Sequence, residues 1–406
     1  MNLSKITTAM MVLSPLLANP AAAQEHDNPL PAAGGKFLIY TNKPAADGVI
    51  TKSPELSLSV GGNAAVSAVM DTGSTGIVIA EDAVSDASQL VSEGADSITY
   101  SSSGKIMSGW RARGRVTIAG ENGQAVTTDD IPMLVVTKVS CVKNARHCQE
   151  GQSTRGIAMI GIGFGREGSN GSSAFTPERN PFLHVADQDG RLRNGYVVTT
   201  TGVQVGVTPE QVAGSDFVLT HLQPDQDHPT DWLPQKVAMT LTGHDLETGT
   251  VLIDTGVSDM YLTLPYAASL EKTINACKNQ RTGQIAYGQN DCARLQQDVR
   301  RASDYTAWTS LKPGTALAIG ILSANHADTL SASYSFAMGD DSAAAPDRVL
   351  LVGNLAAPTP GVDEKASFVN TSVKFLNDFD YLFDGQDGLT GFHQHLAAPV
   401  SRAASE

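Results

Sequence analysis

Hydrophobic and polar residues alternate over short stretches of this chain, and long runs with helical spacing are scarce. Residues 56–60 read Leu-Ser-Leu-Ser-Val, residues 61–63 read Gly-Gly-Asn, and residues 65–70 are mostly apolar again. Alternation with a period of two indicates a strand that is buried on one face, and glycine between two such stretches indicates a turn. The sequence therefore predicts a β-hairpin that leads into an acidic turn at Asp71.

The same pattern predicts strands along most of the chain. A first strand is expected at residues 36–40, and a second hairpin at residues 97–118 with its turn at 101–105. Further strands are predicted at residues 131–139, 157–165, 196–207, 217–219, 236–241, 316–322, 331–338 and 349–354, and a closing strand pair at 375–392. Helical or irregular structure is expected at residues 81–91, 267–279 and 291–302. Strands dominate, so the predicted fold class is all-β.

The acidic turn occurs twice. Asp-Thr-Gly stands at residues 71–73 and again at 254–256, each time between apolar stretches. Average residue usage gives this tripeptide by chance at roughly 1 in 5000 positions. The order of the surrounding strands also repeats, and the apolar run at 349–354 mirrors the run at 159–163. We interpret the chain as an internal duplication that forms two lobes.

Asp71 and Asp254 are the candidate catalytic residues. A carboxylate between two apolar strands lies at the edge of a core, where it is hydrogen-bonded or used for chemistry. Two carboxylates in contact do not both ionise easily, so the pair holds one proton over a range of pH. The ionised member can act as a general base toward water, and the protonated member can hydrogen-bond a carbonyl group. The alternative is that both are structural turn residues.

Six segments stand in a defined order along residues 56–392. They are residues 71–74, the hairpin that carries Tyr100, residues 159–163, residues 254–256, residues 351–353, and the closing pair at 375–384 and 388–392. In this order they resemble the pepsin-like aspartic proteases. The resemblance implies a bilobal fold with two β-barrel-like lobes and a central cleft. Residues 24–205 would form the N-terminal lobe with Asp71, and residues 206–406 the C-terminal lobe with Asp254.

The resemblance also implies roles for the residues around the two aspartates. Thr72 and Thr255 would hydrogen-bond across the lobe junction, and Gly73 and Gly256 would let the backbone turn tightly beneath the carboxylates. Ser74 would support the first carboxylate. The hairpin that bears Tyr100 would be a flap that closes over a peptide or protein substrate.

Two positions depart from the family pattern. Val257 stands where pepsin-like enzymes usually have Thr or Ser, whose hydroxyl donates to the outer oxygen of the second carboxylate; Ser258 is a candidate substitute. Loss of a donor to the ionised form disfavours it, which predicts an acid limb of the pH profile at higher pH. The Trp usual downstream of the first motif is absent, and Trp110 is the candidate replacement behind the flap.

Composition and charge narrow the function classes. The chain has 406 residues, 41% of them hydrophobic, and a net charge of −14, which argues against a nucleic-acid partner. Residues 1–23 are interpreted as a signal peptide, with Lys5 before an apolar stretch and alanines before Gln24. No stretch is long enough to span a membrane. We therefore expect a secreted or periplasmic monomer.

The four cysteines allow three pairings. We expect the local pairs Cys141–Cys148 and Cys277–Cys292, because short loops close at low entropic cost. A metal site on Cys141, His147 and Cys148 lacks a fourth ligand at a suitable spacing, so no metal is expected.

Other sequence motifs add no competing function. His393 and His395 are interpreted as part of a solvated tail. The glycine run at 161–165 lacks the spacing of a dinucleotide loop, and no Gly-x-Ser-x-Gly is present. The predicted function is therefore that of a cofactor-free aspartic endopeptidase. The alternative is a catalytically inactive binding or inhibitor protein of the same fold.

Overall fold

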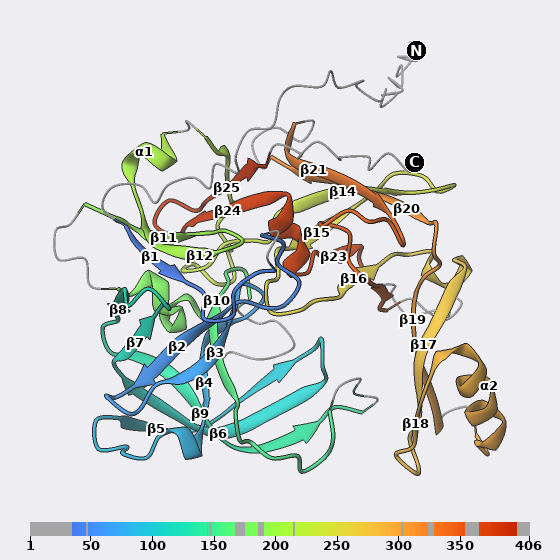
Figure 1. Cartoon of the computed structure of the whole chain (residues 1–406), viewed down its shortest axis with the longest axis horizontal. Coiled ribbons are helices and arrows are strands. Elements are labelled where there is room, and N and C mark those ends of the chain that lie inside the picture. Colours follow the sequence, from blue (N-terminus) through green and yellow to red (C-terminus); the bar gives the residue numbers. More distant parts are fainter. Residues whose placement is uncertain are drawn as a thin grey trace, which may run out of the picture. The chain divides into compact units, whose positions relative to one another are not determined.

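The computed structural model describes most of the chain between residues 35 and 395. The described ranges are 35–45, 48–143, 145, 148–166, 175–185, 191–213, 216–301, 304–323, 329–353 and 365–395. All of them belong to one unit, residues 31–395. The predicted signal peptide at 1–23 lies outside the described residues. Strands in three sheets are the main regular structure in this part of the chain (Figure 1), which confirms the all-β prediction.

The first sheet is formed by strands from the first half of the chain. Its nine strands lie in the order β5-β6-β9-β4-β10-β3-β2-β7-β8. They are β2 (Glu55–Val60), β3 (Val66–Asp71), β4 (Thr75–Ala80), β5 (Val91–Tyr100), β6 (Lys105–Gly114), β7 (Val116–Ala119), β8 (Ala125–Thr127), β9 (Ile131–Cys141) and β10 (Ala158–Ile162). The pairing of β2 with β3 and of β5 with β6 confirms both predicted hairpins.

The second sheet is formed by strands from the second half. Its ten strands lie in the order β18-β17-β19-β22-β16-β23-β15-β14-β20-β21. They are β14 (Lys236–Leu241), β15 (Glu247–Leu252), β16 (Met260–Thr263), β17 (Lys272–Asn279), β18 (Ile285–Tyr287), β19 (Tyr305–Leu311), β20 (Ala316–Leu322), β21 (Leu330–Ala337), β22 (Val349–Leu351) and β23 (Phe368–Asn370). Both large sheets run from one edge strand to another, so the expected barrel-like lobes are open sheets.

The third sheet is shared by the two halves, in the order β1-β12-β11-β24-β25-β13. Its strands are β1 (Lys36–Ile39), β11 (Arg193–Val198), β12 (Gly202–Val207), β13 (Val218–His221), β24 (Phe379–Asp384) and β25 (Leu389–Gln394). Because β11 pairs with β24, this sheet joins the halves through backbone hydrogen bonds. The expected boundary between residues 205 and 206 lies inside β12.

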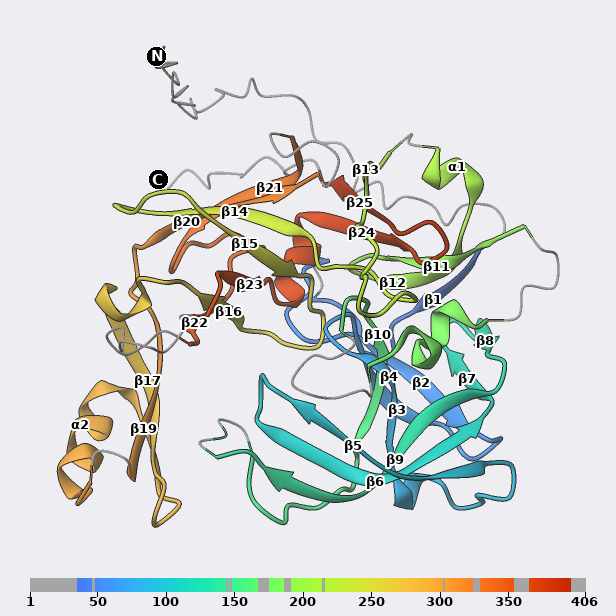
Figure 2. The ribbon, with the colours of Figure 1, turned by 180° about the vertical axis from the view of Figure 1, so that it is seen from behind.

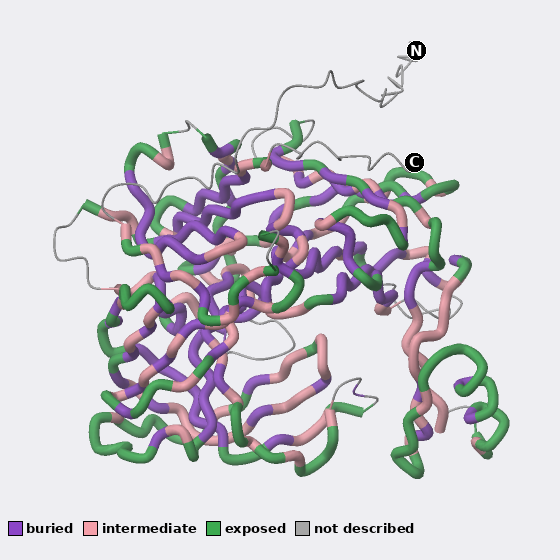
Figure 3. Tube along the Cα trace, viewed as in Figure 1, coloured by how far each residue is buried: buried purple, intermediate pink, exposed green. Residues whose placement is uncertain are grey.

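Helices are short and few among the described residues. The α-helices are α1 (Pro209–Val212) and α2 (Gly288–Asp298), and the 3-10 helices are η1 (Glu81–Ala83), η3 (Pro177–Arg179), η4 (Pro181–Leu183), η5 (Ala267–Ser269) and η7 (Val373–Asn377). In Figure 3 the buried positions follow the strands, whereas most of α2 is exposed. In this part of the chain no helix has the length and apolar character that crossing a membrane requires.

Each acidic turn lies between two strands that are separated by a third. In the first half β10 runs parallel to β3 and antiparallel to β4. In the second half β23 runs parallel to β15 and antiparallel to β16. The counterpart of the run at 159–163 is therefore β23, and the predicted match with 349–354 is wrong. β22 instead pairs parallel with β16, as β9 does with β4.

Two further element predictions need correction. Residues 196–207 form two strands rather than one, because the Thr199 hydroxyl accepts from the amides of Thr201 and Gly202 and stabilises a turn. Within 267–279 most residues form β17, which pairs with β19 (Figure 2). The short helix expected within 81–91 is confirmed as the 3-10 helix η1, which is followed by irregular structure that leads into β5.

Both expected disulfides are present. Cys141 at the end of β9 is bonded to Cys148, and Cys277 of β17 is bonded to Cys292 of α2. The second bond holds α2 beside β17 at the side of the molecule where β18 and β19 also lie (Figure 1). With both sulfurs in a disulfide, Cys141 and Cys148 are not free to bind a metal. His147 lies outside the described residues.

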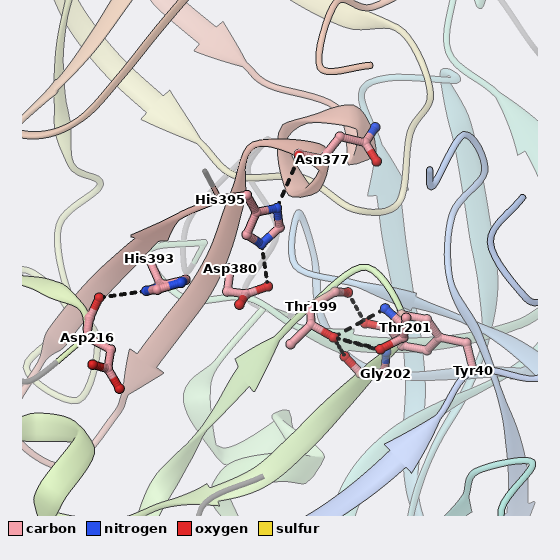
Figure 4. A network of polar contacts seen from close by, with 9 residues as sticks. All are labelled: Tyr40, Thr199, Thr201, Gly202, Asp216, Asn377, Asp380, His393 and His395. Carbon is pink, nitrogen blue, oxygen red and sulfur yellow. Dashed lines mark hydrogen bonds and ion pairs between the residues drawn. The ribbon is translucent and has the colours of Figure 1, made fainter. Parts of the chain in front are cut away.

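The predicted solvated tail at His393 and His395 is instead an ordered part of the shared sheet. His395 has one ring nitrogen 3.1 Å from the Asn377 carbonyl oxygen and the other 3.0 Å from a carboxylate oxygen of Asp380 (Figure 4). Both neighbours are acceptors, so the doubly protonated, positively charged ring satisfies both contacts. Asp380 is fully buried; burial, and next the charge of Asp380, raise the pKa of the Tyr40 hydroxyl.

The pKa of His395 is set by opposing effects. Burial lowers it, but the hydrogen bond and charge of Asp380, the Asn377 carbonyl and the nearby Asp378 raise it above its ordinary value. Because the pKa of His395 is higher in the folded state than in the unfolded chain, its protonation stabilises the folded protein. This contribution is complete below the unfolded pKa of about 6.5. This contribution is lost as pH rises through the folded value.

We predict that His395→Gln, which keeps a donor but removes the charge, lowers the thermal midpoint at pH 5. The difference from the wild type should shrink as pH rises above the raised pKa of His395, because the wild type then loses the same charge. Thermal denaturation between pH 5 and 9 measures this. The control is His393→Gln, since His393 contacts the backbone carbonyl of Asp216. A pH-independent effect of His395→Gln would contradict the assignment.

Candidate active site

The first carboxylate is Asp71, at the end of β3. Its Oδ1 accepts a hydrogen bond from the Gly73 amide at 2.6 Å, and its Oδ2 accepts one from the Ser74 hydroxyl at 2.5 Å. The side chain lies in the turn between β3 and β4, and the residue is 4% exposed. Both oxygens are therefore held by donors from the same short turn.

The second carboxylate is Asp254, in the turn between β15 and β16. Its Oδ1 accepts from the Gly256 amide at 2.8 Å, which repeats the contact of Gly73 with Asp71. Its Oδ2 accepts from the side-chain amide of Asn370 at 2.5 Å. Asp254 is 5% exposed. The two donors to Asp254, Gly256 and Asn370, thus come from segments far apart in the sequence.

The structure brings the two carboxylates face to face. A Cβ atom added to Gly73 would collide with the carboxyl group of Asp254, and one added to Gly256 would lie 2.5 Å from the carboxyl carbon of Asp71. The two carboxyl groups are also within hydrogen-bonding reach of each other. Only glycine fits at either position, because each turn approaches the opposite carboxylate too closely for any side chain.

Two threonines connect the turns. Thr72 Oγ1 donates to the Ile253 carbonyl at 2.7 Å and accepts from the Thr255 amide at 3.0 Å. In reverse, Thr255 Oγ1 donates to the Met70 carbonyl at 2.9 Å and accepts from the Thr72 amide at 3.1 Å. Both threonines are buried. The crossed bonds fix the position of one carboxylate relative to the other.

The electrostatics of the pair favour one shared proton. Burial, and next the neighbouring charge of Asp71, raise the pKa of Asp254 well above its usual range. The hydrogen bonds from Asn370 and the Gly256 amide act in the opposite direction but do not prevail. A buried pair of this kind is most stable with a proton on one member. The pair as a unit therefore retains one proton.

A partly buried arginine, Arg166, interacts with the charges of the pair. Burial lowers the pKa of Arg166, while the charges of Asp254, Asp71 and Asp231 raise it. Asp231 also holds the backbone, since it accepts from the amides of Gly165 and Arg166 at 2.8 and 3.1 Å. A cation beside two carboxylates offsets part of their negative charge. No sequence motif pointed to Arg166, because it follows the glycine run in an irregular segment.

Tyr100 stands at the end of β5, where the predicted flap turns. Its environment includes Asp71 and Ser74, and burial raises the pKa of its hydroxyl. The ring meets Phe175 edge-on, with ring centres 6.2 Å apart. Trp110, the candidate replacement behind the flap, packs against the large core cluster instead. Phe175 is therefore the aromatic neighbour of Tyr100, and sequence reasoning missed it.

The expected loss of a donor at Val257 is also corrected. Val257 offers no hydroxyl and Ser258 is exposed, but Asn370 donates to the outer oxygen of Asp254. The premise for an acid limb at higher pH is therefore wrong. Asn370 belongs to a three-residue strand, β23, which is too short to show a hydrophobic period. Its hydrogen bond to Asp254 becomes visible only when β23 is placed between β15 and β16.

Comparisons with known proteins give a distant likeness. No protein-family model matches this chain, and no curated protein matches it in sequence. Solved structures do match, among them an aspartic proteinase from Irpex lacteus at 14% sequence identity and a TM-score of 0.46. That match covers 90% of this chain and 99% of the other. At this distance the chemistry of the site has to be inferred from its own residues.

We predict that Thr255→Val lowers the free energy of unfolding by about 2–4 kcal/mol, because the Thr72 amide and the Met70 carbonyl lose their partner inside the junction. Urea denaturation measures the change. The control is Thr117→Val, whose hydroxyl meets Thr127 in an exposed pair, and it should change the free energy of unfolding by under about 1 kcal/mol. Equal effects of the two variants would show that the crossed bonds do not stabilise the junction.

Proposed function

We propose that this protein is an exported, pepsin-like aspartic endopeptidase that uses Asp71 and Asp254 to hydrolyse peptide bonds. One observation carries the proposal. Two buried carboxylates from matching turns, far apart in the sequence, face each other, and the pKa of Asp254 is raised. Burial of two carboxylates side by side destabilises a fold unless hydrogen bonds compensate for it, and an ordinary turn does not need such a pair. Carboxylates with strongly shifted pKa values are instead typical of catalytic sites.

In the proposed mechanism the pair enters the reaction with one proton, on Asp254. Ionised Asp71 takes a proton from water, and the water oxygen forms a bond to the peptide carbonyl carbon. Protonated Asp254 donates a hydrogen bond to the carbonyl oxygen as negative charge develops there. The proton held by Asp71 then passes to the amide nitrogen, the C–N bond breaks, and an acid and an amine are released.

The surroundings of the pair support further parts of the proposal. We propose that residues 24–205 and 206–406 act as two lobes, that the β5–β6 hairpin with Tyr100 is a flap, and that a peptide binds beneath it. Tyr100 on this hairpin interacts electrostatically with Asp71, and both aspartates are almost fully buried, so we propose that movement of the hairpin admits the peptide. We propose a secreted or periplasmic monomer that needs no cofactor.

We predict that Asp71→Asn and Asp254→Asn each reduce cleavage of an unfolded protein by about 100-fold or more, since each removes one half of the acid–base pair. The assay runs from pH 3 to 7, with and without a statine-type inhibitor. Asp347→Asn is the control, because Asp347 pairs with Lys374 at an exposed site. A pure wild-type protein that cleaves nothing at any pH would refute the peptidase and favour an inactive binding or inhibitor protein.

A further inference from the structure

The two halves of the site differ in the group that reaches the outer oxygen of each carboxylate. Asp71 Oδ2 is bonded to the hydroxyl of Ser74, three residues later in the same turn. The equivalent position after Asp254 is Val257, which has no donor in its side chain. Asp254 Oδ2 is bonded instead to Asn370, 116 positions away in the sequence. A side-chain amide from β23 has taken the place of a hydroxyl in the turn.

The amide of Asn370 has a fixed orientation. The residue is buried, and it is paired in the sheet with Leu252 on one side and Tyr261 on the other. Its Oδ1 accepts from the Ser372 amide at 3.2 Å. A flipped amide would point its NH2 group at this amide hydrogen and its oxygen at the carboxylate of Asp254. Both contacts would be repulsive, so the nitrogen faces Asp254.

The segment after Asn370 is strained and firmly held. Ser372 has φ 66° and ψ 171°. Among the described residues, no other non-glycine residue has a positive φ. Its neighbours are tied to the second acidic turn: the Thr371 amide donates to the Leu252 carbonyl, and the Val373 amide to the Val257 carbonyl. Strain of this kind persists where the surroundings over-determine the backbone, and it is frequent at functional sites.

We propose that Asn370 is a positioning residue that keeps a permanent N–H donor on Oδ2 of Asp254 and so confines a proton on this carboxyl group to Oδ1. The inference rests on the proposed function of the pair. A hydroxyl such as that of Ser74 can donate to a carboxylate or accept from a carboxylic acid. An amide nitrogen can only donate, so a proton on Oδ2 would face another hydrogen. The two carboxyl groups are therefore chemically unequal.

The charges around Asp254 determine the direction of the expected effect. Burial and Asp71 favour its protonated form, whereas Arg166, the Gly256 amide and the Asn370 amide favour its ionised form. When the Asn370 donor is removed, one of the groups that lower the pKa of Asp254 is lost, and burial and the charge of Asp71 raise this pKa further. The proton on Asp254 is then held more strongly, and the upper limb of the pH profile moves to higher pH.

The test uses Asn370→Leu in the full-length protein. We expect the upper limb of the kcat/KM profile to move up by about one to two pH units, the effect of losing one hydrogen bond to a charged group. Adding Val257→Thr restores a hydroxyl at the position that matches Ser74 and should return the limb toward the wild-type pH. Asn370→Ser, too short to reach Oδ2, should give the same shift if the leucine variant does not fold.

A second readout does not depend on catalysis. Aspartate-selective 13C labelling follows the titration of the Asp254 carboxyl, whose signal is identified by its loss in Asp254→Asn. Asn279→Leu, at a buried asparagine in β17, is the matched control and should leave this titration unchanged. An unshifted titration in Asn370→Leu, or no rescue by Val257→Thr, overturns the inference. A shifted titration in a protein that cleaves no peptide refutes the peptidase and keeps the role of Asn370.

Discussion

The central constraint on this structure is the contact between two carboxylates at a site that little water reaches. Mutual repulsion and loss of solvation would drive Asp71 and Asp254 apart, and each is only a few per cent exposed. The crossed bonds of Thr72 and Thr255 oppose this, because each hydroxyl bonds backbone atoms of the opposite turn. One turn therefore cannot shift without moving the other. The shared sheet adds backbone bonds between the halves at some distance from the pair.

The charge of the pair is compensated in three ways. Backbone amides from Gly73 and Gly256 satisfy one oxygen of each carboxylate. Arg166 provides a partly buried positive charge nearby, and Asp231 holds the backbone that carries it. One proton shared by the pair removes the remaining conflict. Because the first two contributions come from fixed groups, little reorganisation is needed when charge moves during a reaction.

Much of the fold and part of the site could be predicted from the sequence. The hairpins around Asp71 were predictable because alternation with a period of two is visible in a single chain, and repetition of Asp-Thr-Gly identified both aspartates. The strand β17 was missed because its residues do not alternate and it depends on pairing with β19. Arg166 and Phe175 were missed because they reach the site from irregular segments, where tertiary contacts determine the structure.

The most instructive failure concerns the second half of the duplication. The apolar run at 349–354 matched the first half in composition, but the strand inserted beside Asp254 is β23. A donor lost from the turn at Val257 is supplied by Asn370 on this strand, and the strained backbone at Ser372 fixes its amide. The two halves thus reach the same hydrogen-bond count on each carboxylate with different chemistry. The second turn has no hydroxyl donor of its own, and its carboxylate is still hydrogen-bonded at both oxygens because a neighbouring strand supplies the donor.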